Sequence, residues 1–213
     1  MTVIFIWTAV CTLGVLTALT GEYHSRLLLA AIGKFVAATA YLSLAWSMGA
    51  AGSEYGRILL LGMGFCWVGD MLLVSSKSKN LFLFGLVSFL LGHIAYIGAF
   101  ATRGVSLLVV IAAGFVMIVF AWFVLRWLKP GLEDRMRRPV LFYVLAICVM
   151  MTVAAGTYSI DENWAIPLGA LLFLLSDLAV ARDRFIAPGF INRAWGLPVY
   201  FSAQLILATS VAY

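Results

Sequence analysis

The chain has 213 residues, of which 64% are hydrophobic and only 11% are charged, and its formal net charge is +5. Soluble proteins contain roughly 45–50% apolar and about 25% charged residues, so this composition, with a mean hydropathy of +1.08, excludes a soluble globular domain and indicates a membrane protein. Because one helical crossing takes about 20 residues, the chain has room for about eight crossings and for no further soluble domain.

Eight apolar windows follow one another along the chain, and each predicts a helix that crosses the hydrocarbon core. They are residues 3–20, 27–47, 57–75, 81–101, 104–125, 139–157, 163–181 and 194–212. The linkers are short, so consecutive helices are expected to be antiparallel neighbours in one bundle. The first window has no basic residue before it and no small-residue cleavage site after it, so we expect it to be retained. The predicted fold is all-α: one integral membrane domain with a bundle of eight transmembrane helices.

Basic residues are concentrated on one side of the predicted membrane. The linkers after the first, third, fifth and seventh windows, with their flanks, contain Arg26, Lys77, Lys79, Arg126, Lys129, Arg135, Arg137, Arg138, Arg182, Arg184 and Arg193. The other side has only Arg57 and Arg103. The positive-inside rule therefore predicts that both termini are non-cytoplasmic, in the inner membrane if the source is bacterial. The same asymmetry explains the positive net charge without a nucleic-acid partner.

Cysteine and histidine usage argues against a metal site. Cys11, Cys66 and Cys148 all fall inside windows, where we expect buried thiols rather than disulfides. The chain has only two histidines, His24 and His93, so the three nitrogen ligands of many catalytic zinc sites cannot be assembled. We expect no metal and no other cofactor. The sequence also has no GxSxG motif for a serine nucleophile and no phosphate-binding or dinucleotide motif.

Several windows contain polar side chains at similar depths. At about 1.5 Å per residue, Lys34, Asp70 and Asp177 lie roughly 10, 8 and 6 Å from the cytoplasmic ends of their helices. Gln204 and His93 lie deeper, roughly 15 and 18 Å from the same side. Ionised groups in the bilayer cost a few kcal/mol, so they face the bundle interior and are candidates for function. We therefore expect these side chains to converge.

Two interpretations of this convergence are open. A structural ion pair between Lys34 and Asp70 or Asp177 is one, although a single lysine cannot neutralise two carboxylates. The other is a catalytic pair, because two carboxyl groups near one cation differ in proton affinity, so that one can act as an acid and the other as a base. For His93, the glycines and aromatic residues on its helix face suit close packing as well as a cavity wall.

The sequence resembles the YhhN family, which includes the animal transmembrane lysoplasmalogenases. The likeness is carried by GDMLL (69–73), FLFGLVSFLLGHIAYIGAF (82–100), LLFLLSDLAVARDRF (171–185) and VYFSAQLILATS (199–210). It covers most of the chain, and the combination of the GD, GHxxY, SD and AQ elements is more specific than any one of them. One position departs from the family pattern, because Phe35 follows Lys34 where the family usually has proline.

The resemblance implies an eight-helix enzyme that hydrolyses the vinyl ether of lysoplasmalogens and releases a fatty aldehyde and a glycerophospho-headgroup. It implies that Asp70 and Asp177 are the catalytic acid and base, in an order that the sequence does not give. The partners implied are a lysolipid substrate and the lipid bilayer. The residues expected to bind the substrate or to support the pair are Lys34, His93, Tyr96, Tyr200 and Gln204.

A second class of function is also open. In a proton-coupled transporter or lipid-binding membrane protein, Asp70, Asp177 and His93 would relay protons. The sequence shows no pair of broken helices of the kind found in transporters, although Pro167 and Pro198 can each interrupt a span. The sequence predicts neither an oligomeric state nor the physiological lipid.

Overall fold

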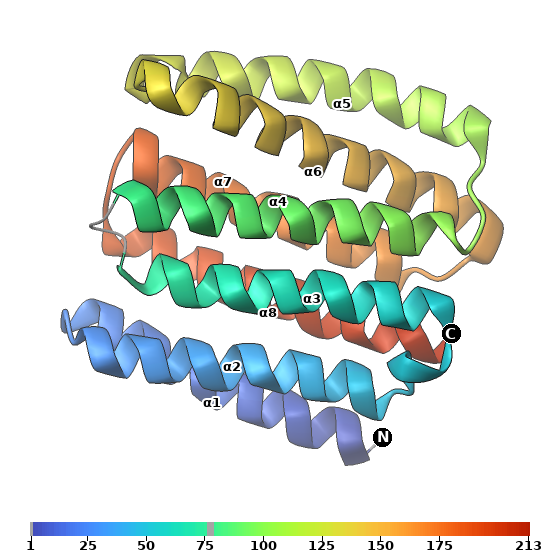
Figure 1. Cartoon of the computed structure of the whole chain (residues 1–213), viewed down its shortest axis with the longest axis horizontal. Coiled ribbons are helices and arrows are strands. Elements are labelled where there is room, and N and C mark those ends of the chain that lie inside the picture. Colours follow the sequence, from blue (N-terminus) through green and yellow to red (C-terminus); the bar gives the residue numbers. More distant parts are fainter. Residues whose placement is uncertain (1, 76–78) are drawn as a thin grey trace.

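The computed structural model describes residues 2–75 and 79–213, which form eight α-helices and no β-strand (Figure 1). The helices are α1 (Thr2–Tyr23), α2 (Leu27–Ser47), α3 (Glu54–Leu72), α4 (Lys79–Ala101), α5 (Leu107–Leu128), α6 (Asp134–Asp161), α7 (Ala165–Phe185) and α8 (Phe190–Thr209). Short 3₁₀ turns are η1 (Ala50–Gly52), η2 (Leu73–Ser75), η3 (Lys129–Gly131) and η4 (Ser210–Ala212). The predicted all-α fold is confirmed, and Lys77 lies outside the described residues.

The helix boundaries differ from the predicted windows mainly where charged residues continue a helix. The window 27–47 coincides with α2, whereas α6 is 28 residues long and exceeds its window of 139–157 at both ends. The window at 104 begins too early, because Gly104 has a φ of 88° and α5 starts only at Leu107. Hydropathy follows the hydrocarbon boundary, while backbone hydrogen bonding continues through the charged turns beyond it.

The bundle has the surface of a membrane protein. Seven helices, all except α3, are long and apolar enough to cross a membrane. Arg57 and Asp70 lower the hydropathy of α3, which nevertheless lies between α2 and α4 in the bundle (Figure 1). Large apolar side chains point outward, as in Phe5 (76% exposed) and Leu28 (75% exposed), and such a surface is suited to lipid rather than water. The chain is a polytopic all-α membrane protein.

Six helices form a closed ring through successive contacts, in the order α2, α3, α4, α6, α7, α8 and back to α2. Outside this ring, α1 packs on α2 and α8, and α5 packs chiefly on α6. Both termini lie at one end of the bundle (Figure 1). We call the other end, where α1 joins α2, α3 joins α4, α5 joins α6 and α7 joins α8, the basic end.

Glycines allow two pairs of helices to approach closely beside polar residues. A Cβ atom on Gly33 would lie 2.2 Å from the backbone nitrogen of Ala18, so α1 and α2 meet backbone to backbone immediately before Lys34. A Cβ atom on Gly69 would lie 2.7 Å from the ring of Phe89, which brings α4 against α3 immediately before Asp70. Small residues at such contacts are typical of membrane helix packing, where van der Waals contact replaces hydrophobic driving force.

The packing predicts opposite effects for two glycine substitutions. Gly33→Ala is expected to lower the thermal midpoint of the purified protein, because backbone atoms of α1 must move. Gly64→Ala is the matched control, because a Cβ atom at Gly64 meets nothing within 4 Å. There the loss of backbone freedom in the unfolded chain favours folding, by about 0.5–1 kcal/mol. Thermal unfolding in detergent measures both, and an equal shift in the two variants would contradict the close contact.

An ion pair and several hydrogen bonds connect the helices and loops at the end of the bundle where both termini lie. Arg103 binds Asp161 with Nε 2.7 Å from Oδ2 and with Nη2 3.0 Å from Oδ1, and its guanidinium lies over the ring of Tyr55. The hydroxyls of Tyr55 and Ser210 are hydrogen-bonded, and Asn163 donates to the Ser210 carbonyl at 2.9 Å. These bonds join α3, α6, η4 and the loops between helices.

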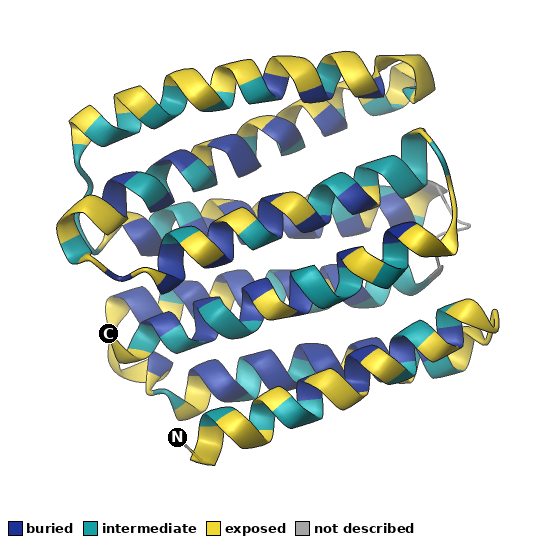
Figure 2. Cartoon of the chain, turned by 180° about the vertical axis from the view of Figure 1, so that it is seen from behind, coloured by how far each residue is buried: buried dark blue, intermediate teal, exposed yellow. Residues whose placement is uncertain are grey.

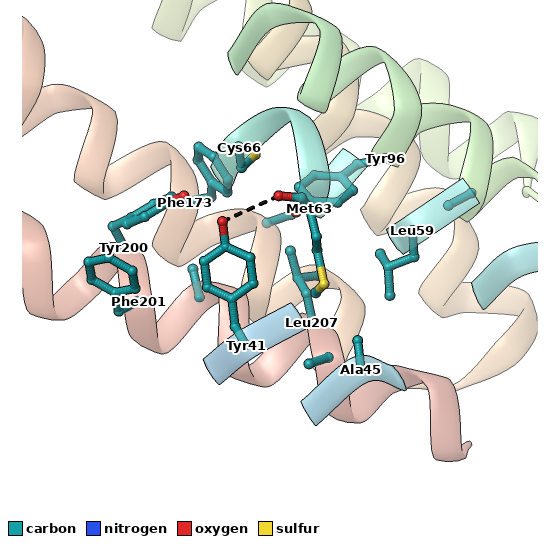
Figure 3. Packing of buried hydrophobic residues seen from close by; sticks show 14 of the residues in the cluster. Tyr41, Ala45, Leu59, Met63, Cys66, Tyr96, Phe173, Tyr200, Phe201 and Leu207 are labelled. Atoms are coloured by element: carbon teal, nitrogen blue, oxygen red, sulfur yellow. Dashed lines mark hydrogen bonds between the residues drawn. The ribbon is translucent and has the colours of Figure 1, made fainter. Parts of the chain in front are cut away.

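The interior combines aromatic rings with hydroxyl groups. Fully buried rings from α2, α4, α7 and α8 meet in the centre of the ring of helices, among them Tyr41, Tyr96, Phe173 and Phe201 (Figure 3). Figure 3 shows the Tyr41 hydroxyl directed at the backbone of α3, where it donates to the Met63 carbonyl at 3.3 Å. Cys11, Cys66 and Cys148 are buried free thiols, as predicted.

Candidate functional site

A cavity of about 350 Å³ lies toward the basic end of the bundle, and all eight helices contribute to its wall, including α1 and α5 outside the ring. Four of the residues expected from the sequence line it: Lys34, Asp70, Asp177 and Tyr200. The other three, His93, Tyr96 and Gln204, are fully buried and do not line it. The expected convergence of Asp70 and Asp177 on one chamber is thus present, with a second layer of polar residues behind it.

Asp70 is held by tyrosine hydroxyls. Its Oδ2 accepts a hydrogen bond from Tyr200 at 2.8 Å and a longer one from Tyr41 at 3.4 Å. Tyr200 in turn accepts from the side-chain amide of Gln204 at 3.2 Å, and the carbonyl oxygen of that amide accepts from Tyr96 at 2.7 Å. In this series of hydrogen bonds, each donor points toward the next residue in the direction of Asp70. Asp70 as a whole residue is only 6% exposed, so these hydrogen bonds determine how its carboxyl group faces the cavity.

Asp177 has a different set of neighbours. Its Oδ2 accepts a hydrogen bond from the Tyr143 hydroxyl at 2.9 Å and lies 3.6 Å from Nε2 of His93. The imidazole packs edge-on against the rings of Tyr143 and Phe173. Within the part of the chain that the structure describes, Nε2 of His93 has no hydrogen-bond partner. The side chain of Asp177 is 17% exposed, so Asp177 faces the cavity while His93 lies behind it.

Lys34 binds neither aspartate by a hydrogen bond or an ion pair that the structure shows. Its Nζ lies 3.0 Å from Oε1 of Glu22 on α1. The ion pair considered between Lys34 and Asp70 or Asp177 is therefore replaced by a pair with Glu22, because the close contact of α1 with α2 brings that carboxylate beside the lysine. Glu22 lies in α1, although the predicted first window ended before it.

Glu22 belongs to a line of alternating charges at the basic end of the cavity. Its other carboxylate oxygen accepts from the guanidinium of Arg193 on α8, and Arg193 Nε lies 3.2 Å from Oδ2 of Asp183 on α7. We call Lys34, Glu22, Arg193 and Asp183 the ion-pair ladder; its formal charges sum to zero, and all four residues line the cavity. The cavity wall therefore contains the ion-pair ladder at the basic end, in addition to Asp70 and Asp177.

Sequence reasoning missed five residues of this site: Tyr41, Tyr143, Glu22, Arg193 and Asp183. Tyr41 had a recognisable signal, because it lies seven residues, or two helical turns, after Lys34 and so on the same face of α2. For Tyr143, the only signal was the general rule that a buried tyrosine hydroxyl forms a hydrogen bond. Glu22 was assigned to a linker, and Arg193 was counted only as a topological charge. Glu22 and Arg193 became site residues through contacts between helices that are distant in sequence.

No group of three or more histidine, cysteine, aspartate and glutamate side chains is arranged to hold a metal ion within residues 2–75 and 79–213. The polar side chains of the site instead form hydrogen bonds and ion pairs with one another. Two carboxyl groups, one buried and one 17% exposed, each accept a hydrogen bond from a tyrosine hydroxyl and line one cavity. Such a pair is suited to proton transfer to and from a molecule bound between them.

The hydrogen bonds of Asp70 predict a specific stability effect. Tyr200→Phe removes one buried hydrogen bond from Asp70 and one from the side-chain nitrogen of Gln204, and this loss is expected to lower the free energy of unfolding by about 1–3 kcal/mol. Tyr158→Phe is the matched control, because Tyr158 is 45% exposed and is expected to show no change. Denaturation of both variants in detergent measures the difference, and equal stability would argue against the hydrogen-bond chain.

Comparison with known proteins agrees with the resemblance noted in the sequence. The model of the YhhN family matches residues 29–211. The bovine (Bos taurus) lysoplasmalogenase TMEM86A is 30% identical over 158 residues, which are 71% of this chain and 64% of that protein. The pig (Sus scrofa) lysoplasmalogenase TMEM86B is 31% identical over 168 residues, 76% of this chain and 66% of that protein.

A bacterial protein is similar to this chain as well. A lysoplasmalogenase of Mycobacterium bovis is 32% identical over 148 residues, 67% of this chain and 55% of that protein. The chain thus spans just under two thirds of the length of the bovine and pig relatives and about half of the mycobacterial one. No solved structure matches it. The family match includes seven of the eight helices and both aspartates that line the cavity, and on this basis the chain belongs to the YhhN family.

Proposed function

We propose that this protein is an intramembrane hydrolase that cleaves the sn-1 vinyl ether bond of a lysoplasmalogen or a related lysolipid. The names of its relatives support the reaction. The observation that carries the proposal is that Asp70 and Asp177, from α3 and α7, line the same cavity. The cavity wall also includes both charged and apolar side chains, as a lipid with one chain requires.

Vinyl ether hydrolysis needs one proton donor, one carboxylate and water. One aspartic acid protonates the carbon β to the ether oxygen, and the double bond becomes an oxocarbenium ion. The other aspartate, as a carboxylate, stabilises this cation and takes a proton from the attacking water. The resulting hemiacetal breaks its bond to the glycerol oxygen, which takes up a proton, and releases the fatty aldehyde and the glycerophospho-headgroup.

The supporting residues act through the aspartates. Tyr200 and Tyr41 orient Asp70, and Gln204 and Tyr96 fix the Tyr200 hydroxyl as a donor toward it. His93 and Tyr143 border Asp177 and hold that carboxyl group toward the cavity. Tyr41, Tyr96, Gln204 and His93 are positioning groups in the proposal, because they do not line the cavity. Tyr200 and Tyr143 line it and therefore also border the bound substrate.

The headgroup binds at the ion-pair ladder in this proposal. The guanidinium of Arg193 and the ammonium of Lys34 line the cavity at the basic end, and a phosphate is attracted to such groups. The sn-1 linkage then lies deeper, at the level of Asp70 and Asp177. Lys34 thus contacts the headgroup rather than a catalytic carboxylate.

Orientation in the membrane is part of the proposal. The basic end contains most lysines and arginines, so the positive-inside rule assigns it to the cytoplasm and both termini to the other side. A C-terminal alkaline phosphatase fusion in a bacterial host is then expected to be active and a C-terminal green fluorescent protein fusion to be dark. The reverse pattern would move the opening of the site to the opposite leaflet.

The reaction is tested by isotope labelling. Purified protein is incubated in D₂O with a 1-octadecenyl lysolipid, the aldehyde is trapped by reduction, and its mass is measured. We expect release of aldehyde with one deuterium at carbon 2, because the solvent proton is added there. The matched 1-octadecanoyl ester is expected to give no fatty acid. Cleavage of the ester alone would contradict vinyl ether chemistry.

Transport or lipid binding is the alternative outcome of the same preparation. The cavity lies toward the basic end, whereas the polar residues at the other end are bonded to one another. This arrangement favours a site with one opening over a route across the membrane. Solute uptake into proteoliposomes driven by a pH gradient, without release of aldehyde from any lysolipid, would favour the transporter.

A further inference from the structure

α5 contributes little to the core of the bundle. Among its 22 residues only Ala121, Val124 and Leu128 are buried. The rest of the helix is largely exposed, as Figure 2 shows for the helix at the top of that view, and Leu108 is 79% exposed. A helix with so narrow a buried stripe is held mainly by that stripe, so the role of α5 depends on what the stripe touches.

The buried stripe of α5 is a wall of the cavity. Val124 and Leu128 line the cavity together with Phe120, one helical turn earlier. They face apolar residues of α4 and α6 in a separate small core cluster. We call this part of the cavity the α5 arm, and its lining residues are Leu86, Phe120, Val124, Leu128, Val140 and Val144. It contains no charged residue, unlike the ion-pair ladder.

An aromatic contact separates the α5 arm from the ladder at the basic end. The rings of Phe82 on α4 and Phe185 on α7 meet with centroids 6.0 Å apart, and the guanidinium of Arg184 lies 4.4 Å from the Phe82 centroid. Since α4 and α7 are the two neighbours of α6 in the ring of helices, this contact crosses the basic end between α6 and the rest of the ring. The helices α1, α2, α3 and α8 lie on one side, and α5 and α6 lie on the other.

We propose that the α5 arm holds the single hydrocarbon chain of the substrate and that α5 determines which chains fit. This inference rests on the proposed function, because it assigns the tail of the lysolipid whose headgroup meets the ladder. Asp177 on α7 and Tyr143 on α6 line the same cavity as the arm and the ladder, and Tyr143 is next to Val144 of the arm in the sequence. When the headgroup is at the ladder and the hydrocarbon chain is in the arm, the sn-1 linkage of the lipid thus lies beside Asp177.

The selection is steric. A chain that leaves the bilayer for the α5 arm exchanges one apolar environment for another, so the hydrophobic effect does not favour longer chains. Packing decides instead, because protein interiors are close-packed and added volume in a filled space is costly. A larger side chain at Val124 therefore shortens the space available to the chain without disturbing the ladder.

Matched variants test this with two substrates that share a headgroup and carry a 1-octenyl or a 1-octadecenyl chain. For Val124→Phe we expect the kcat/KM ratio of the long to the short substrate to fall at least tenfold. Val119→Phe makes the same change on the same helix at a residue that is 55% exposed, and the ratio is expected to stay unchanged. An unchanged ratio in both variants would overturn the proposal.

A second measurement does not require catalysis or a folded variant. The unmodified protein is irradiated with an alkyl ether lysolipid that carries a diazirine at the end of its chain, with and without excess unlabelled lysolipid. We expect competable labelling of residues 120–128 or 140–144. Competable labelling only on α2, α3 or α8, or none that is competable, would overturn the proposal. Labelling in the arm without any hydrolysis would keep the chain site and reject the proposed reaction.

Discussion

Replacing Asp177 by asparagine is expected to lower the rate of vinyl ether hydrolysis by about 10²–10⁴-fold, the range for loss of a general acid or base. Asp70→Asn is expected to have an effect of the same size, because both carboxyl groups line the one cavity. Asparagine keeps the shape of the side chain and can still accept a hydrogen bond from Tyr143 or Tyr200. The variant proteins are therefore expected to fold. Aldehyde release from a 1-alkenyl lysolipid in proteoliposomes measures the rate.

The control for these variants is Asp134→Asn. Asp134 is an exposed aspartate at the basic end, with 89% of its side chain accessible and a surface ion pair to Arg137, and turnover is expected to be unchanged. Size-exclusion profiles and thermal midpoints establish that each variant is folded. Normal turnover in both Asp70→Asn and Asp177→Asn would show that the pair is not catalytic.

The largest stability effect is expected for Glu22→Gln. The carboxylate of Glu22 bonds Lys34 with one oxygen and Arg193 with the other, and the side chains of Lys34 and Glu22 are only 9% and 12% exposed. Its loss leaves a largely buried lysine without its anion and turns an amide toward two cations. Removing one partner of a buried ion pair costs about 3–5 kcal/mol. Denaturation of the purified protein in detergent measures the loss.

A double variant separates the cost of the unpaired charge from other effects. Replacing Glu22 by glutamine and Lys34 by methionine together removes both charges, and an apolar pair in place of a buried ion pair is often neutral. We expect the double variant to regain most of the stability, since Arg193 keeps Asp183 as its partner. Asp134→Asn again serves as the surface control. A double variant less stable than Glu22→Gln would contradict the pairing.

The sequence predicted much of the fold, because hydropathy and helix length are local properties in a bilayer. Every backbone group in the hydrocarbon core must be hydrogen-bonded within its own segment, so each apolar window becomes a helix. The window 27–47 coincided with α2 for this reason. The ends of α6 were underestimated because its charged first turn lies in its own helix but outside the apolar pattern.

The sequence did not determine whether Pro167 and Pro198 interrupt their helices. Pro198 lies inside α8, which continues through it, and Pro167 lies in the first turn of α7. A proline in the first turn costs no backbone hydrogen bond. The interruptions considered for a transporter are therefore not present in these two helices, as the structure describes them.

By itself the sequence determined that polar residues in apolar helices would turn inward, because lipid offers them no partner. That rule predicted that Lys34, Asp70 and Asp177 face the bundle interior, and the structure has all three on the cavity wall. It did not determine their partners. Lys34 pairs with Glu22, and Asp177 lies beside Tyr143 and His93. These pairings, and the separation of the α5 arm from the ion-pair ladder, depend on which helices touch, and helix contacts follow from shape and close packing that a hydropathy pattern does not contain.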